Sequence, residues 1–129
     1  MKVGDKYRIT EKVTVDKTAA TIGSGALEVF GTPFLLAMME NAALTYMKPV
    51  LPEGKSTVGT AAAVNHTAPS PVGIEVTVEV TVTAVSENGK MVDFAMEAWD
   101  TSGSIGNGTH QRAIVDIERF MNKANSKPV

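Results

Sequence analysis

The sequence contains no cysteine, and this absence limits both its chemistry and its covalent structure. Disulfide bonds, thiolate metal sites and a cysteine nucleophile are all excluded. Proteins of oxidising compartments often carry disulfides, so the composition is compatible with a reducing compartment. We therefore expect a cytoplasmic protein.

The sequence also has no large excess of positive or negative charge and no long, purely apolar run. The formal net charge is −2 and no basic stripe is present, which argues against a nucleic acid or an anionic membrane surface as a partner. The longest mostly apolar stretch, residues 33–51, contains Glu40, Asn41 and Lys48, so it is not expected to span a membrane. The N-terminal residues lack the apolar core of a signal peptide.

Metal and cofactor motifs are missing as well. The two histidines, His66 and His110, do not combine with Asp or Glu in a metal-binding spacing such as HExxH. The glycine-rich segment GSIGNG, residues 103–108, does not match a dinucleotide or phosphate loop. It is typical of a strand start whose missing side chains admit another backbone or a ligand. We predict no metal and no cofactor.

What the sequence does contain is sufficient for one folded domain. The 129 residues are 43% hydrophobic and 20% charged, which is ordinary for a soluble protein with a real core. No internal repeat or low-complexity segment divides the chain. We expect a single domain over residues 1–129.

One helix is strongly indicated. Thr32 is a good N-cap, and Pro33 is favoured in the first helical turn. The residues that follow, FLLAMMENAALTYM, are helix formers with apolar side chains on nearly every face, and Pro49 and Pro52 end the run. Such a helix must be covered by other elements.

Alternating apolar and polar residues predict five strands around this helix. Asn88-Gly89 is a strong hairpin signal between two of them, so these two should be antiparallel neighbours. Residues 16–25 are rich in small and turn-forming residues and are expected to form a loop or a flexible segment. The predicted strands are Tyr7–Val15, Ser56–Thr67, Ile74–Val85, Lys90–Asp100 and Ser104–Phe120.

One long buried helix and a curled, mostly antiparallel sheet form an α+β domain with the hot-dog architecture. A single helix covers one face of the sheet, so sheet edges stay open. Pairing with a second copy is a common way to protect such an edge. We therefore expect a homodimer or a higher oligomer built from such pairs.

Few residues could carry chemistry. Glu40 lies in the most apolar helix, where a carboxylate is costly to bury unless it is paired or hydrogen-bonded, so it faces either a solvent gap or a functional site. His66 ends a strand of small residues, and His110 lies in NGTHQRA. Each histidine could be structural or a proton acceptor, and Thr32 could be a plain helix cap.

Three segments resemble the hot-dog thioesterases of the fluoroacetyl-CoA thioesterase type. They are VFGTPFLLAMMENA, beginning at Val29, GTAAAVNHTAPSPVG, beginning at Gly59, and GTHQRAIVDIERF, beginning at Gly108. They occur in the same order with similar separations and cover nearly the whole chain. The resemblance implies hydrolysis of a small acyl-CoA thioester to a free acid and CoA.

The resemblance also implies roles for individual residues. The family's catalytic threonine, glutamate and histidine fall on Thr32, Glu40 and His66, and a glycine whose amide holds the thioester carbonyl falls on Gly59. These residue types suit thioester cleavage, which needs a nucleophile, a proton acceptor and an oxyanion donor. Glu40 could orient the base and its water or attack the carbonyl itself.

For His110 and Arg112 the resemblance implies a place near the site or in contact with CoA. Thr32 and Glu40 are eight residues apart, which corresponds to about 12 Å along a helix axis. Direct contact within one chain is therefore not expected, and we predict a composite site built by two chains.

The segment before Thr32 departs from the family pattern. The fluoroacetyl-specific enzyme closes its site with a lid that contains aromatic residues, whereas the corresponding stretch here, TIGSGALEVF, has Phe30 as its only aromatic residue. We expect a shorter, more flexible lid and a broader or different short-chain acyl group.

Three other functions fit parts of the pattern. A non-catalytic acyl-CoA or small-ligand binding module would keep the pocket and Arg112 but would not need Glu40 or His66. A hot-dog hydratase or dehydratase also uses a histidine and an acid on this fold, and fold alone does not fix the reaction. A purely structural dimer would leave the carboxylate in the apolar helix unexplained.

Overall fold

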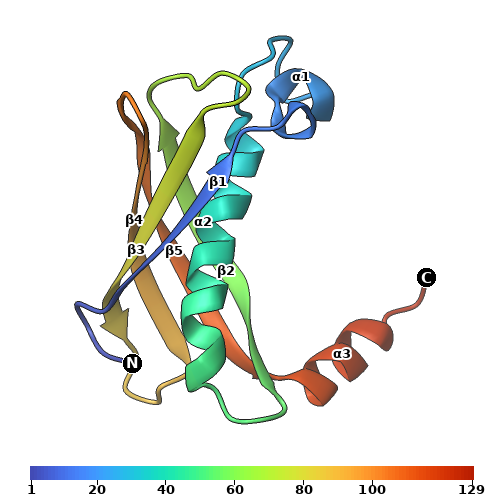
Figure 1. The fold of residues 1–129 in the computed structure, drawn as a ribbon. Coiled ribbons are helices and arrows are strands. Elements are labelled where there is room, and N and C mark those ends of the chain that lie inside the picture. The colour runs from blue at the N-terminus through green and yellow to red at the C-terminus, as the bar shows by residue number, and fades with distance from the viewer.

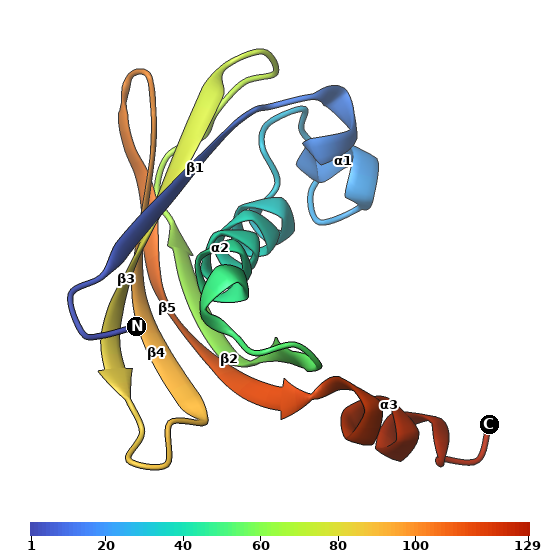
Figure 2. The same cartoon turned by 60° about the horizontal axis from the view of Figure 1, so that its bottom comes forward.

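The computed structural model describes all residues from 1 to 129 and places a five-stranded antiparallel sheet around one long helix. The strand order across the sheet is β1-β3-β4-β5-β2. Figure 1 shows helix α2, Thr32–Met47, against the sheet, and Figure 2 shows that the sheet curls around it. The α+β hot-dog architecture predicted from the sequence is confirmed. The strands are β1 (Lys6–Lys12), β2 (Lys55–His66), β3 (Glu75–Val85), β4 (Met91–Asp100) and β5 (Gly103–Asp116).

The core lies between α2 and the concave face of the sheet. Helix α2 buries one side against the strands, and its outer side carries the exposed Ala37 and Asn41. The sheet therefore covers a single face of this helix, although its sequence is apolar almost all round. The buried helix residues are Leu35, Met38, Met39, Ala42, Ala43 and Met47, and they form one cluster with alternating residues of β3 and β4.

Strand β2 is the edge strand next to β5 and carries an irregularity that matters for the site. Its register against β5 shifts between Gly59 and Ala61, which marks a β-bulge at Thr60. Gly106 and Gly108 of β5 lie so close to β2 that an added Cβ would approach the carbonyl oxygens of Asn65 and Ala63 at 2.5 and 2.3 Å. The sequence predicts that the missing side chains of this segment admit either another backbone or a ligand. The structure shows that these two glycines admit the backbone of β2.

Two predictions for residues 7–25 were wrong. Strand β1 stops at Lys12, and the segment expected to be a loop contains a 3-10 turn, η1 (Val15–Lys17), and a short helix, α1 (Ala19–Ile22). The side chain of Thr18 caps α1 by accepting a hydrogen bond from the Thr21 amide at 3.3 Å. A further 3-10 turn, η2 (Lys48–Val50), follows α2.

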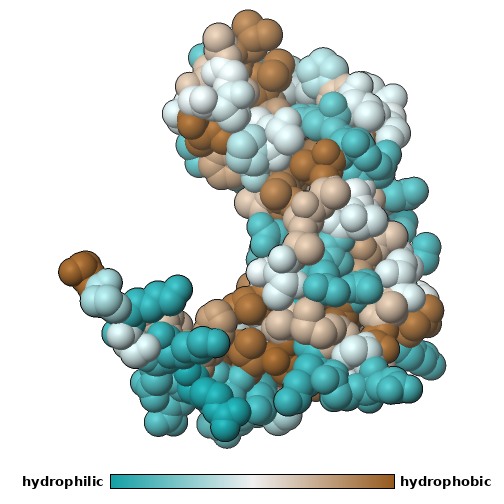
Figure 3. All heavy atoms as spheres, turned by 180° about the vertical axis from the view of Figure 1, so that it is seen from behind, coloured by the Kyte–Doolittle hydropathy of each residue, from teal (hydrophilic) through white to brown (hydrophobic).

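The last predicted strand also ends early. Its final residues belong to helix α3, Ile117–Asn125, because the Asp116 side chain caps the helix by accepting from the Arg119 amide at 3.0 Å. Ile117, Phe120 and Met121 follow helical spacing and remain exposed. Figure 3 shows α3 projecting from the body, with a hollow between it and the part of the molecule formed by α1.

None of the helices is both long and apolar enough to cross a membrane.

Candidate active site

Thr32 and His66 meet at one end of helix α2. Thr32 is the first helical residue, while Gly31 takes the N-cap position, so the prediction that Thr32 caps the helix was wrong. Its hydroxyl is free for another partner, and Thr32 Oγ1 lies 2.8 Å from Nδ1 of His66, the last residue of β2. A hydroxyl hydrogen-bonded to an imidazole can pass its proton to that ring or hold a water molecule for it.

The surroundings of His66 favour a neutral imidazole. Burial lowers the pKa of His66 below its ordinary value of 6.5. Its Nε2 atom is buried and has no hydrogen-bond partner within the chain, and a backbone contact with Ala68 offsets the effect of burial on the pKa only in part. The ring of Phe30 lies edge-on to it, with the ring centroids 6.4 Å apart. A neutral imidazole near physiological pH is able to accept a proton.

A hollow of about 300 Å³ opens beside this pair. Its walls come from the α1 region, the segment before α2 and the end of β2. Phe30 is its only aromatic residue, and it is buried rather than placed on an overlying lid. The lining residues are Ala19, Ser24, Val29, Phe30, Thr32, His66, Thr67, Ala68 and Pro69.

Glu40 lies in a second group, half-way along α2. Its side chain is 41% exposed, and Oε2 lies 3.7 Å from Nη1 of the buried Arg112. The carboxylate approaches strand β2 at Gly59, where an added Cβ would come within 2.7 Å of Oε2. Glu40 is therefore neither deeply buried nor unpaired, and a glycine is needed where it meets the strand.

Arg112 is held by two further buried residues, Thr57 and His110. Arg112 Nε donates to Thr57 Oγ1 at 2.9 Å, and Nη2 donates to the Thr57 carbonyl at 3.0 Å. Nη1 lies 3.1 Å from His110 Nε2, and His110 Nδ1 lies 2.8 Å from the Ala61 carbonyl. These hydrogen bonds hold the guanidinium inside the protein, with Nη1 directed toward Glu40.

The hydrogen bonds of His110 determine its protonation state. The Ala61 carbonyl can only accept, so Nδ1 must carry the proton, and the Arg112 guanidinium can only donate, so Nε2 must be unprotonated. Burial and the nearby Arg112 charge lower the pKa of His110 below 6.5. His110 is therefore a neutral imidazole that accepts a hydrogen bond from Arg112.

The predicted residues therefore form two separate groups within one chain. Thr32 pairs with His66, while Glu40 lies beside Gly59, His110 and Arg112. Sequence reasoning missed Thr57, which lies two positions before Gly59 and so faces the same side of β2. The spacing of two residues from Gly59 could have placed Thr57 on the same face of the strand. Nothing in the sequence, however, indicated that Thr57 contacts Arg112.

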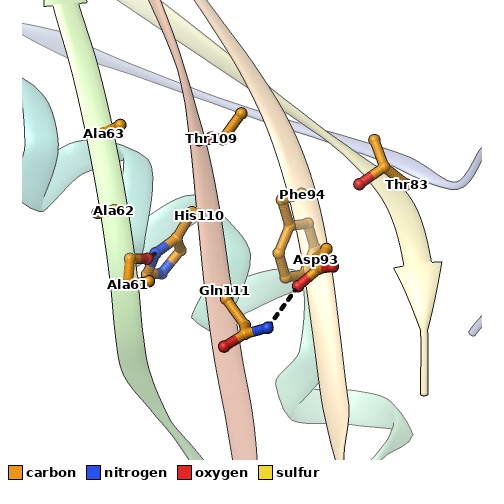
Figure 4. A pocket seen from close by; sticks show the side chains of 9 residues that line it. All are labelled: Ala61, Ala62, Ala63, Thr83, Asp93, Phe94, Thr109, His110 and Gln111. Carbon is orange, nitrogen blue, oxygen red and sulfur yellow. Dashed lines mark hydrogen bonds between the residues drawn. The ribbon is translucent and has the colours of Figure 1, made fainter.

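Another hollow, of about 390 Å³, lies on β2, β5, β4 and β3, and His110 is the only one of the predicted site residues among those that line it. Figure 4 shows helix α2 behind the strands, so this hollow opens on the sheet face turned away from the helix. Gln111 donates a hydrogen bond to Asp93 there at 3.0 Å, and small alanine side chains of β2 form one wall. Neither Thr32, Glu40 nor His66 contributes to it.

Comparison with known proteins connects this geometry to a family. The model of the family described as fluoroacetyl-CoA-specific thioesterase matches residues 13–118. A fluoroacetyl-CoA thioesterase of Streptantibioticus cattleyicolor is 39% identical over 100 residues, covering 78% of this chain and 70% of that protein.

Solved structures agree with this match. A structure of the fluoroacetyl-CoA thioesterase superposes with a TM-score of 0.93 at 33% identity, covering 100% of this chain and 98% of the other. A hot-dog-like protein from Thermanaerovibrio acidaminovorans gives a TM-score of 0.87 at 29% identity, covering 98% and 94% of the two chains. The chain belongs to the fluoroacetyl-CoA-specific thioesterase family.

Proposed function

We propose that this protein is an acyl-CoA thioesterase that hydrolyses a short-chain acyl-CoA to the free acid and CoA. Membership of a thioesterase family supports the reaction. The observation that carries the proposal is the 2.8 Å contact between Thr32 and the neutral His66 beside a small hollow with both apolar and polar lining residues. This contact supplies a hydroxyl and a base next to a space that suits a short acyl group.

In the proposed reaction, His66 accepts a proton as oxygen attacks the thioester carbonyl. The attacking oxygen belongs either to water or to Thr32, and a tetrahedral intermediate forms. The C–S bond then breaks, and the proton held by His66 passes to the departing CoA thiolate. If Thr32 attacks first, a water molecule cleaves the resulting ester in a second step. We assign the developing oxyanion to the Gly59 amide.

Glu40 reaches this reaction only if two chains combine, because in one chain it lies about 12 Å along α2 from Thr32. We propose a homodimer in which strands β2 of two copies pair antiparallel about a two-fold axis at Ala63. The bulge at Thr60 then brings Gly59 of one copy opposite His66 of the other. The Glu40 of one copy, beside Gly59, faces the Thr32–His66 pair of the second and either orients its water or attacks the carbonyl.

The surface of the chain supports this arrangement. Strand β2 is an open sheet edge, and Ala61, Ala62 and Ala63 on it are small and exposed. The exposed apolar residues of α3 begin beside the same strand, where the Ile117 amide donates to the Gly54 carbonyl at 3.0 Å. Open strand edges and uncovered apolar residues are both typical of an interface.

The hollow beside His66 supports a short acyl group as the substrate. Apart from Phe30 and His66, its lining consists of alanine, serine, threonine, valine and proline side chains, and it lacks an aromatic lid. Because no aromatic side chain encloses a halogen, we do not expect a strong preference for the fluoroacetyl group over acetyl or propionyl. We propose that the reaction needs no metal or cofactor and that it takes place in the cytoplasm.

The test is thiol release from a panel of acetyl-, fluoroacetyl-, propionyl-, branched and aromatic acyl-CoAs. We expect turnover of at least one short-chain substrate and a loss of kcat of about 100-fold or more in His66→Ala. Thr10→Ala is a matched control, because Thr10 lies on β1 and pairs only with Thr77 at 2.8 Å. It should retain wild-type activity.

The panel also separates the alternative functions. Tight binding of an acyl-CoA without turnover would replace the enzyme by a ligand-binding module. Turnover that is unchanged in His66→Ala would remove the base from the proposed reaction. Hydration of an unsaturated acyl-CoA without thiol release would point to a hydratase.

A further inference from the structure

The buried residues around Arg112 form a polar cluster, called the mount below, that is not part of the hydrophobic core cluster. Thr57, His110 and Arg112 are each buried, although all three are polar. Burying a guanidinium is costly unless its N–H groups find acceptors. Here Thr57 accepts twice and His110 accepts once, so three donor directions are fixed.

The fixed guanidinium leaves Nη1 directed at Glu40. Because Nε and Nη2 are both held by Thr57 on β2, the planar group cannot rotate, and Nη1 stays 3.7 Å from Glu40 Oε2. The Glu40 side chain is 41% exposed and has no hydrogen bond within the chain apart from this ion pair. An exposed glutamate on a helix would otherwise sample several rotamers.

We propose that Thr57 is a positioning residue for the thioesterase reaction, acting through Arg112 to hold the Glu40 carboxylate at Gly59. His110 completes the mount as a neutral hydrogen-bond acceptor and takes no part in proton transfer. A protonated His110 would direct an N–H at the Arg112 guanidinium, which has no lone pair to receive it. The inference rests on the proposed function, since it assigns Glu40 a part in that reaction.

The experiment compares Thr57→Val with Thr57→Ser. Valine keeps the volume of threonine and removes the hydroxyl, whereas serine keeps the hydroxyl and removes the methyl group. We expect Thr57→Val to lower kcat about 10-fold, which corresponds to about 1.4 kcal/mol of transition-state stabilisation, with KM changed less than about 3-fold. Thr57→Ser should stay within about 2-fold of wild type. The reverse order would show a packing role and overturn the proposal.

A crystal structure of each variant tests the same idea without activity. The Arg112–Glu40 contact should be lost or lengthened in Thr57→Val and kept in Thr57→Ser. An unchanged contact in Thr57→Val would refute the positioning role even if no acyl-CoA is turned over. If Thr57→Val does not fold, Thr57→Ala, which also removes the hydroxyl that accepts from Arg112, takes its place in the comparison with Thr57→Ser. An Arg112–Glu40 contact that is unchanged in Thr57→Ala would refute the positioning role.

Glu40→Gln separates a failure of this inference from a failure of the proposed function. If Glu40→Gln is as active as wild type, Glu40 has no part in the reaction and the proposed function needs revision. If Glu40→Gln loses activity while Thr57→Val does not, the proposed function stands and the mount is refuted. Loss in both, with Thr57→Ser active, supports both.

Discussion

At the scale of single residues, Gly59 is the point where the backbone leaves room for a carboxylate. A Cβ at this position would lie 2.7 Å from Glu40 Oε2, 3.1 Å from His110 Cε1 and 3.6 Å from Arg112 Nη1. The first distance is too short for any real contact, so something must move. The half-exposed Glu40 side chain can move most easily, since His110 and Arg112 are buried.

We therefore expect Gly59→Ala to damage activity more than stability. Displacement of Glu40 from Arg112 should lower kcat about 10-fold or more, while the free energy of unfolding falls by only about 1 kcal/mol. Steady-state kinetics and urea denaturation measure the two effects. Ala61→Ser, on the same strand, adds an atom away from Glu40 and should be close to wild type. A large loss of stability with normal kcat in the folded fraction would contradict this account.

The individual contacts of the site were beyond what the sequence could predict. The resemblance pointed to Thr32 and His66, but their 2.8 Å contact depends on where β2 ends relative to the start of α2. The neutral state of His110 follows from two hydrogen-bond partners, one of them a backbone carbonyl 49 residues away. Long-range partners of this kind leave no local pattern.

At the scale of elements, strand β2 carries parts of both groups and forms one of the two edges of the sheet. If two copies pair through β2 about an axis at Ala63, this side chain lies directly opposite its own copy. Like charges in such a position are destabilising, and opposite charges are stabilising.

We expect Ala63→Lys and Ala63→Glu each to yield monomers with strongly reduced activity, because each separates Glu40 from the second chain's His66. Light scattering coupled to size exclusion reports the assembly. Mixing the two variants should restore both the dimer and the activity through a Lys–Glu pair. Thr83→Lys, which places the same charge at an exposed position on β3, is the control. A fully active monomeric Ala63→Lys would disprove the composite site.

Most elements, unlike the contacts, were predictable from local patterns. Alternation located the strands to within a few residues, and the turn chemistry of Asn88-Gly89 identified the β3–β4 hairpin, whose pairing the structure confirms. The errors lie where short-range capping overrides alternation. Thr18 caps α1 inside a segment that looks like a loop, and Asp116 converts the apparent end of β5 into α3.

At the scale of the whole molecule, the two neutral histidines link stability to pH. Burial lowers the pKa of both His66 and His110 below 6.5. The unfolded chain binds protons at these sites at a higher pH than the folded chain does. Stability therefore increases with pH across this range and is lost as the pH falls below about 6.5 toward the folded pKa values.

We expect the free energy of unfolding to be nearly constant from pH 8 to 7 and to decrease from pH 6.5 to 5. Urea denaturation at fixed protein concentration measures it, since a dimer would make the midpoint concentration-dependent. His110→Gln should flatten the slope in this interval. The carboxylates with lowered pKa, Asp5, Glu79 and Asp116, lose their contribution only at more acidic pH. A profile that is level down to pH 5 would contradict the assignment of neutral histidines.

The extra residue in strand β2 also constrains how the chain length can vary. Gly59 and His66 are separated by an odd number of positions, and in a regular strand an odd separation puts two side chains on opposite faces. The unpaired Thr60 makes the effective count even, so Gly59 and His66 both face α2. Deleting Thr60 itself would leave six positions in a regular strand and keep both residues on one face, whereas deleting another residue while the bulge remains would turn one of them away from α2. The length of this stretch of β2 can therefore change only together with its bulge, whereas the surface turns have no such restriction.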